Sequence, residues 1–183
     1  DDVMNQQRQI VYGVRKQVLE TAESKDLTLK NEILGKIANA ISSIVSVAGE
    51  DGLDFKKIIE EFVGIIPVDS QSQKELENQI KGMDTTDQVV DFLSNLAKKF
   101  YEERESQVGG EVARQMEVFV YLNTIDTLWI EHLDTMDDLR AGIGLRGYAG
   151  REPLVEYKKE AFELFEKLIA EIDFEIVHRI FKV

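Results

Sequence analysis

Apolar residues recur at intervals of three and four along almost the whole chain of 183 residues, which is the spacing of helices that bury one face. Pro67 and Pro153 are the two prolines, and each stands where such a pattern ends or begins. Because proline breaks the interior of a helix, this scarcity leaves room for long uninterrupted helices. The sequence therefore predicts an all-α fold.

Local signals divide this pattern into separate helices. The expected helices cover residues 3–20, 28–48, 53–66 and 73–81, a segment that begins after Thr85, residues 111–140, and a last segment that begins at Pro153. Thr28 is expected to cap the second helix, and residues 68–72 are expected to form a loop. Thr85 and Gln88 have the spacing of a capping box, in which each side chain bonds the backbone amide of the other residue.

The last two expected helices are long and carry matching apolar stripes. The first stripe contains Phe119, Leu122, Ile125, Trp129, His132, Leu133, Met136 and Leu139, and the second contains Tyr157, Ala161, Leu164, Phe165, Leu168, Ile172, Ile176 and Ile180. Two long helices joined by a loop of about a dozen residues are expected to fold back as an antiparallel hairpin. We expect Trp129 to pack in the core and His132 to be a hydrogen-bonded helix residue rather than a metal ligand.

Composition excludes several kinds of chemistry. The chain has no cysteine, so disulfides and thiolate metal sites are impossible, and its two histidines are far apart in sequence. It contains no P-loop motif and no run of eighteen apolar residues, and no signal peptide is expected. The net charge of −13 is opposite in sign to that of a typical nucleic-acid binder. Asp134, Asp137 and Asp138 are expected to form a solvated acidic face rather than a metal site.

The charge is unevenly distributed along the chain. Residues 49–109 contain 14 acidic and 7 basic residues, whereas residues 140–159 contain 5 basic and 2 acidic ones. The basic residues of this second segment are Arg140, Arg146, Arg151, Lys158 and Lys159. The basic segment is either a chance cluster or a surface that meets an anionic partner.

Gly142, Gly144 and Gly147 have the G-x-G-x-x-G spacing of a dinucleotide-binding turn. That turn requires a buried strand before the first glycine and a helix that opens at the last one, whereas the preceding sequence DTMDDLR is charged and has helical period. A nucleotide-dependent enzyme is therefore disfavoured. Instead, we expect Gly142 to end a helix in a left-handed cap, and Gly144, Gly147 and Gly150 to provide positive φ in the following turn.

Four short motifs in the last third of the chain are distinctive. They are L-W-x-E-H-L from Leu128 to Leu133, M-D-x-L-R-x-G-I from Met136 to Ile143, L-R-G-Y-A from Leu145 to Ala149, and E-Y-K-x-E-x-F from Glu156 to Phe162. Together they closely resemble the two-helix finger of the SecA family of bacterial preprotein translocases. The opening DDVMNQQRQIVYGVR and the ending EIVHRIFKV resemble the helical scaffold of the same family.

The resemblance implies a division into domains. It assigns residues 1–48 to the first part of the helical scaffold, whose long helix would lack its beginning, and residues 110–183 to the second part. The finger would occupy about 111–172, with its tip loop at 141–152. Residues 49–109 carry no recognised motif, and by position they would form an inserted helical wing domain. Glycine-rich stretches at 49–52 and 108–110 agree with these boundaries.

The resemblance also implies a function. The chain would be a non-catalytic piece of an ATP-driven translocase, with no cofactor of its own, because ATP and Mg belong to motor domains elsewhere in the parent chain. Its finger would contact unfolded preprotein at the SecY channel, and its scaffold would couple or regulate those motor domains. The place would be the cytoplasmic face of the bacterial inner membrane, where anionic lipids are a further partner. The alternative is a free-standing helical adaptor that binds another protein.

Specific residues follow from the same motifs. The finger-tip residues implied to touch polypeptide and channel are Ile143, Leu145, Arg146, Gly147, Tyr148, Ala149 and Arg151. Tyr148 would touch the moving polypeptide, because tyrosine offers an apolar face and one hydroxyl without reading sequence. Arg8 and Arg15, which lie seven residues apart on the first helix, are expected to face the motor domains. The family usually has glutamine at Gly150 and often has a larger polar residue at Gly144, so this tip is expected to be more flexible.

Overall fold

A computed structural model describes residues 1–24, 26–49, 52–146, 150 and 152–183. Across these residues it contains seven helices and no strand, which confirms the all-α fold class. The helices are α1 (Asp2–Ser24), α2 (Thr28–Ala48), α3 (Phe55–Ile65), α4 (Ser70–Lys81), α5 (Thr86–Val108), α6 (Gly110–Arg146) and α7 (Pro153–Ile180).

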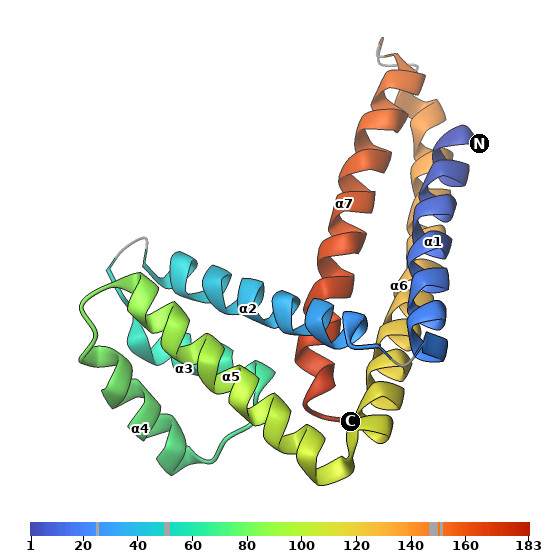
Figure 1. Ribbon diagram of the computed structural model, residues 1–183. Coiled ribbons are helices and arrows are strands. Elements are labelled where there is room, and N and C mark those ends of the chain that lie inside the picture. The colour runs from blue at the N-terminus through green and yellow to red at the C-terminus, as the bar shows by residue number, and fades with distance from the viewer. Residues whose placement is uncertain (25, 50–51, 147–149, 151) are drawn as a thin grey trace.

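The helices form two groups (Figure 1). Helices α6 and α7 run antiparallel over most of their length, and α1 lies along them, so these three make a slender bundle. The expected hairpin is therefore confirmed. Helix α2 leaves this bundle sideways and packs against α3 and α5, and α4 packs on α3. The N-terminus lies toward the hairpin tip, and the C-terminus lies at the opposite end of the bundle.

The core of the second group is made of aliphatic side chains and one aromatic ring. Phe62 of α3 is fully buried, and Ile80 of α4 and Leu93 of α5 are also inaccessible to solvent. Helix α2 turns a stripe that contains Ile33, Ile37 and Ile41 toward this core, with each residue nearly fully buried. Because α2 also contacts α6 and α7, its stripe connects the two groups.

Carboxylates start several of these helices. The Asp26 Oδ1 accepts a hydrogen bond of 3.0 Å from the Thr28 amide. Thr28 is the first residue of α2, so our prediction that it caps this helix is wrong. The Asp69 side chain accepts a hydrogen bond of 2.7 Å from the Ser72 amide and caps α4, which begins at Ser70. Residues 70–72, which were expected to belong to a loop, are therefore helical. The capping box of Thr85 and Gln88 is confirmed, with the Gln88 amide 3.2 Å from the Thr85 hydroxyl.

Phe119 does not belong to the buried face of α6, contrary to expectation, and is 58% exposed. Val120 and Tyr121 are buried in its place. The start of α6 packs against α2 and α5, and its later turns pack against α1 and α7. Different helices therefore cover α6 at different points along its length, and its buried face changes direction accordingly. A stripe extended from one end of the helix does not follow this change.

A buried ionic cluster joins α5 to α6, and it was not predicted. The side chain of Glu117 is 1% exposed, and it accepts hydrogen bonds from Arg114 Nε at 2.6 Å and from the Tyr101 hydroxyl. Arg114 also pairs with Glu105, which receives a second contact of 3.0 Å from Lys30 of α2. Burial raises the pKa of Tyr101, and the Glu117 carboxylate raises it further, so this hydroxyl remains a donor.

The chain passes from α5 to α6 through a single residue, Gly109. Its φ of 88° and ψ of 150° lie in a region that is essentially restricted to glycine. The Gly109 amide donates to the Glu105 carbonyl at 2.8 Å, which closes the last turn of α5. The direction of α6 relative to α5 therefore depends on this one backbone conformation.

Gly109→Ala is expected to lower the free energy of unfolding by about 1–3 kcal/mol, because alanine is strained at this φ and ψ. A β-carbon at Gly109 would meet no atom within 4 Å, so the loss would come from the backbone alone. Gly110→Ala is the matched control, since Gly110 begins α6 and a β-carbon there also meets nothing within 4 Å. Urea denaturation of both variants measures the difference, and equal midpoints would contradict the prediction.

Candidate functional site

The hairpin tip is shorter than the sequence suggested, because α6 continues to Arg146. Gly142 and Gly144 are helical and do not have positive φ, so the expected left-handed cap at Gly142 and the expected turn at Gly144 are wrong. Each glycine weakens a helix by about 1 kcal/mol relative to alanine. Helix α6 nevertheless persists because Ile143 packs against the core and Arg146 is tied to α7.

Gly142 and Gly144 do not form a phosphate-binding turn. Both lie in a helix whose interior amides are already bonded to carbonyls one turn earlier, and helix precedes them where a dinucleotide site needs a strand. Gly150 does take the expected positive φ, at 77°. Gly147, Tyr148, Ala149 and Arg151 lie outside the described residues, so their predicted roles at the tip stay predictions.

Arg146 closes the hairpin near its tip. Its Nη1 forms an ion pair with Glu160 and lies 3.8 Å from Oε2 of Glu156, and both acids belong to α7. Only about one third of each of these three side chains is exposed. The guanidinium that we expected to meet an outside partner is therefore already shared between two carboxylates of the same chain, and its first role in this structure is to hold α6 and α7 together.

Large apolar side chains are exposed just beside this ion pair. Leu145 of α6 is 73% exposed, and Leu154 and Val155 in the first turn of α7 are about as open to solvent. Leu145 was predicted as a contact residue, whereas Leu154 and Val155 were not. Both residues lie outside the apolar stripe that begins at Tyr157, and this position could have indicated that they are exposed. Exposed apolar residues grouped at the end of a rigid element are typical of a contact surface.

The basic segment is less positive than its composition suggests. Arg140 forms ion pairs with Asp137 on its own helix and with Asp1 at 3.7 Å, in addition to the internal pairing of Arg146. Lys158 and Lys159 are exposed on α7. The positive surface near the tip, within the part of the chain that is described, therefore rests on these two lysines.

The two arginines expected to face motor domains have different surroundings. The Arg15 Nε lies 3.0 Å from Asp126 Oδ1 of α6, so its charge is balanced within the chain. Arg8 bonds the Asn5 side chain at 3.2 Å on the same helix. Close to Arg15, α1 and α6 expose Tyr12, Leu19 and Ile130 around the buried ring of Trp129. This apolar surface between the middle turns of α1 and α6 lies beside the Arg15 pair.

Trp129 and His132 both have the roles expected from the stripe. Trp129 is buried, with the Tyr12 ring at 6.4 Å in an edge-on arrangement. His132 is also buried, and its Nε2 lies 2.7 Å from the Gln7 Oε1. Burial lowers the pKa of His132, so its ring is neutral at pH 7.

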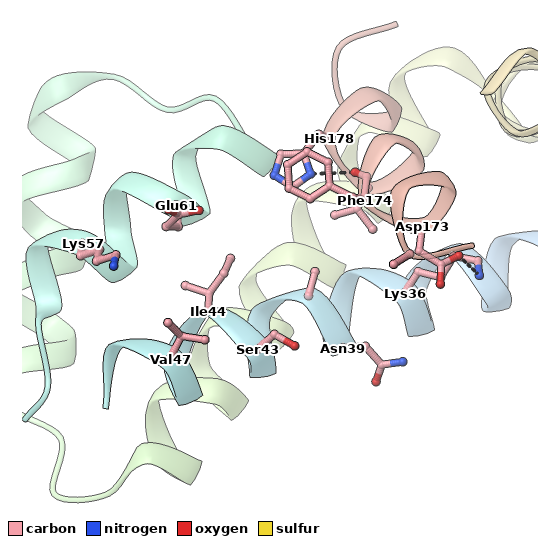
Figure 2. A pocket seen from close by; sticks show the side chains of 13 residues that line it. Lys36, Asn39, Ser43, Ile44, Val47, Lys57, Glu61, Asp173, Phe174 and His178 are labelled. Atoms are coloured by element: carbon pink, nitrogen blue, oxygen red, sulfur yellow. Dashed lines mark hydrogen bonds and ion pairs between the residues drawn. The ribbon is translucent and has the colours of Figure 1, made fainter. Parts of the chain in front are cut away.

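A groove lies where α2, α3 and the end of α7 meet (Figure 2). At one end of the groove, Lys36 bonds Asp173 at 2.6 Å, and Phe174 stacks on His178 with ring centroids 3.8 Å apart. Burial opposes the charge on Lys36, but the contact with Asp173 outweighs it and raises the pKa of the lysine. Among the described residues that line the groove, no hydrogen bond links Ser43 to a base, and the contact of Lys36 with Asp173 joins α2 to α7.

Two classes of site can be checked against the described residues. No group of three or more His, Cys, Asp or Glu side chains among them is placed to hold a metal ion, including the acidic residues around Asp137. None of the described helices combines the length and the apolar character needed to cross a bilayer.

The chain was compared with known proteins. A family model described as the SecA Wing and Scaffold domain matches residues 1–183. One relative named Protein translocase subunit SecA, from Symbiobacterium thermophilum, is 35% identical over 99% of this chain and 21% of the relative. Another, from Thermodesulfovibrio yellowstonii, is 35% identical over 100% of this chain and 19% of the relative. The same name belongs to a relative from Pelotomaculum thermopropionicum, 36% identical over 100% of this chain and 20% of the relative. The chain thus spans about one fifth of the length of the curated relatives that it matches.

Proposed function

Because this chain belongs to the SecA wing and scaffold family, we propose that it is the part of a protein translocase that carries motion from ATPase domains elsewhere in the parent chain to the tip of its helical hairpin. The observation that carries the proposal is the hairpin itself. It is long and packed along its length, an ion pair closes it near its end, and exposed apolar side chains lie beside that pair.

The hairpin has the dimensions of a lever. Helix α6 has 37 residues and α7 has 28, and at a rise of about 1.5 Å per residue the longer one spans roughly 55 Å. A single helix of that length bends, whereas two packed helices with α1 along them resist bending because close-packed interiors are stiff. A push at the base therefore reaches the tip as a displacement.

The middle of the bundle and the tip offer different contacts. Beside the middle turns of α6, Tyr12, Leu19 and Ile130 give an apolar surface on which motor domains could pack. At the tip, Leu145 and Leu154 flank the segment that contains Tyr148. Apolar side chains and a tyrosine hold an unfolded polypeptide without reading its sequence, which suits a protein that moves many different substrates.

We assign no catalytic step and no cofactor to this chain. In our proposal ATP and Mg are bound by the motor domains of the parent protein, and the partners of this chain are those domains, the SecY channel and the unfolded preprotein. Lys158 and Lys159 near the tip favour an anionic membrane surface as a further contact. The proposed location is the cytoplasmic face of the bacterial inner membrane, without insertion into it.

Tyr148→Ala in the full-length translocase that carries this segment is expected to reduce preprotein transport by roughly five- to thirty-fold, the effect of removing one central contact residue. ATP binding is expected to stay unchanged, because the nucleotide sites belong to other domains. Tyr148→Phe is the matched control and should transport nearly as well, since it keeps the ring. Transport into membrane vesicles and nucleotide titration measure the two effects, and transport at the parent rate by Tyr148→Ala would contradict the proposal.

A further inference from the structure

Gln7 is a polar residue in the buried face of α1, and both ends of its amide group are used. It is 5% exposed. Its Nε2 donates to the Ala161 carbonyl of α7 at 3.1 Å, and its Oε1 lies 2.7 Å from Nε2 of His132 on α6. One side chain of α1 therefore contacts both arms of the hairpin.

The direction of these bonds is fixed by their partners. A carbonyl can accept but not donate, so the amide nitrogen of Gln7 must face Ala161 and its oxygen must face the imidazole. The neutral His132 ring consequently carries its proton on Nε2. The ring lies between Trp129 and Phe165, with centroids 5.5 and 6.0 Å away. Because these neighbours offer no other acceptor, the hydrogen bond of His132 depends on Gln7.

Contacts of α1 on either side of Gln7 have the same character. The carboxylate of Asp1 meets the Tyr157 hydroxyl of α7 and the Arg140 guanidinium of α6. About two turns beyond Gln7, Arg15 pairs with Asp126 of α6. Asp1 and Arg15 are partly open to water, whereas Gln7 is buried, so an unmatched Gln7 could not be satisfied by solvent.

Such a contact is sensitive to the position of α1 along the hairpin. A shift of α1 by one residue moves it about 1.5 Å and turns its side chains by about 100°. The apolar neighbours Met4, Val11 and Val18 could be repacked after such a shift, because apolar contacts have no direction. Gln7 could not, because it would lose two directional bonds and leave His132 without a partner.

We propose that Gln7 is a positioning residue that fixes the register of α1 on the hairpin, so that a displacement of α1 moves α6 and α7 together. This inference rests on the function proposed above. It predicts that loss of the two hydrogen bonds separates ATP hydrolysis from transport, because the motor still turns over while its motion reaches the tip incompletely.

The test uses the full-length translocase with Gln7→Leu, which keeps the size of the side chain and removes both bonds. We expect preprotein transported per ATP hydrolysed to fall about three- to ten-fold while the rate of ATP hydrolysis stays close to that of the parent. Gln9→Leu is the matched control, because Gln9 lies on the exposed face of α1, and it should change neither quantity.

A cross-link between α1 and α6 in the Gln7→Leu variant distinguishes a loss of register from a general loss of stability. This segment contains no cysteine, so in a full-length translocase whose remaining cysteines have been replaced, Arg15→Cys and Asp126→Cys can be joined selectively by a short bismaleimide in the Gln7→Leu background. If Gln7 acts through register, this cross-link restores transport per ATP. A proportional fall of hydrolysis and transport that the cross-link does not restore would overturn the inference and leave Gln7 with a purely structural role.

Two further outcomes separate this inference from the proposed function. If Gln7→Leu behaves like the parent while Tyr148→Ala loses transport, the inference is wrong and the proposed function stands. If neither substitution affects transport, both are wrong. NMR of the His132 ring adds an independent signature, because the chemical shifts of Nε2 and its proton report the hydrogen bond to Gln7 Oε1 and should move toward those of an unbonded ring in Gln7→Leu, and unchanged shifts would also overturn the inference.

Discussion

Arg114→Leu is expected to lower the free energy of unfolding by about 3–5 kcal/mol, the loss seen when one partner of a buried ion pair is removed. Glu117 is 1% exposed, and Arg114 is the cation that it contacts. Without Arg114, the Glu117 carboxylate must be buried without a counter-charge or take up a proton. Thermal and urea denaturation of the purified chain would measure the loss.

Arg15→Leu is the control for this prediction, because it removes an arginine from another pair between helices. The side chains of Arg15 and Asp126 are 42% and 47% exposed, so water replaces much of the lost contact. We expect a loss of at most about 1 kcal/mol. If the two substitutions were equally destabilising, burial would not be what makes the Arg114 cluster important.

The dependence of stability on pH gives a second readout of the same cluster. Burial raises the pKa of Glu105, but hydrogen bonds from Arg114 and Lys30 outweigh it and hold the pKa below the ordinary value of 4.5. A carboxylate with a lowered pKa in the folded state stabilises the fold above the unfolded pKa, and this contribution is lost as the pH falls below it. The loss of stability between about pH 4.5 and pH 3 should therefore be smaller in Arg114→Leu than in the parent.

Phe62→Ala is expected to be as damaging, with a loss of about 3–5 kcal/mol, because it leaves a cavity in the centre of the second helical group. Phe62 is fully buried in α3, which packs against α2, α4 and α7. Phe119→Ala is the control, since Phe119 is more than half exposed and its removal should change stability by less than about 0.5 kcal/mol. Denaturation of both variants gives the comparison.

Hydrogen exchange of Phe62→Ala would also test the division of the chain into wing and scaffold. If residues 49–109 behave as a wing that opens separately, amides of α3 and α4 should lose protection while those in the outer half of α6 and α7 keep theirs. Equal loss of protection along the whole chain would contradict that division and would indicate a single cooperative unit.

The helices and their order were predictable because they depend on local signals. Apolar spacing identified the hairpin, and Thr85, Gln88 and Pro153 marked helix starts that the structure confirms. Trp129 and His132 were also placed correctly in the core. In each case a few neighbouring residues contain the physical cause, so the cause is visible in one stretch of sequence.

The parts that were missed depend on residues far apart in the chain. Helix α6 passes through Gly142 because Arg146 finds acids on α7, which the local sequence does not show. Glu117 looks like an ordinary surface residue of a helix, yet α2 and α5 cover it. Gln7 and His132 are 125 positions apart, and nothing near either residue indicates the other.

Gly109 alone connects α5 to α6, so the length of this connection fixes the rotation of α6 about its axis relative to α5. Each residue of a helix advances the rotation by about 100°, so one residue added or removed here would turn the whole hairpin about its own axis relative to α5. Leu145 and Leu154 would then point in a different direction from the same base. Loops elsewhere can lengthen without this effect, because they do not lie in line with the hairpin. The direction in which the tip residues point is therefore set by the length of the connection at Gly109, at the opposite end of α6.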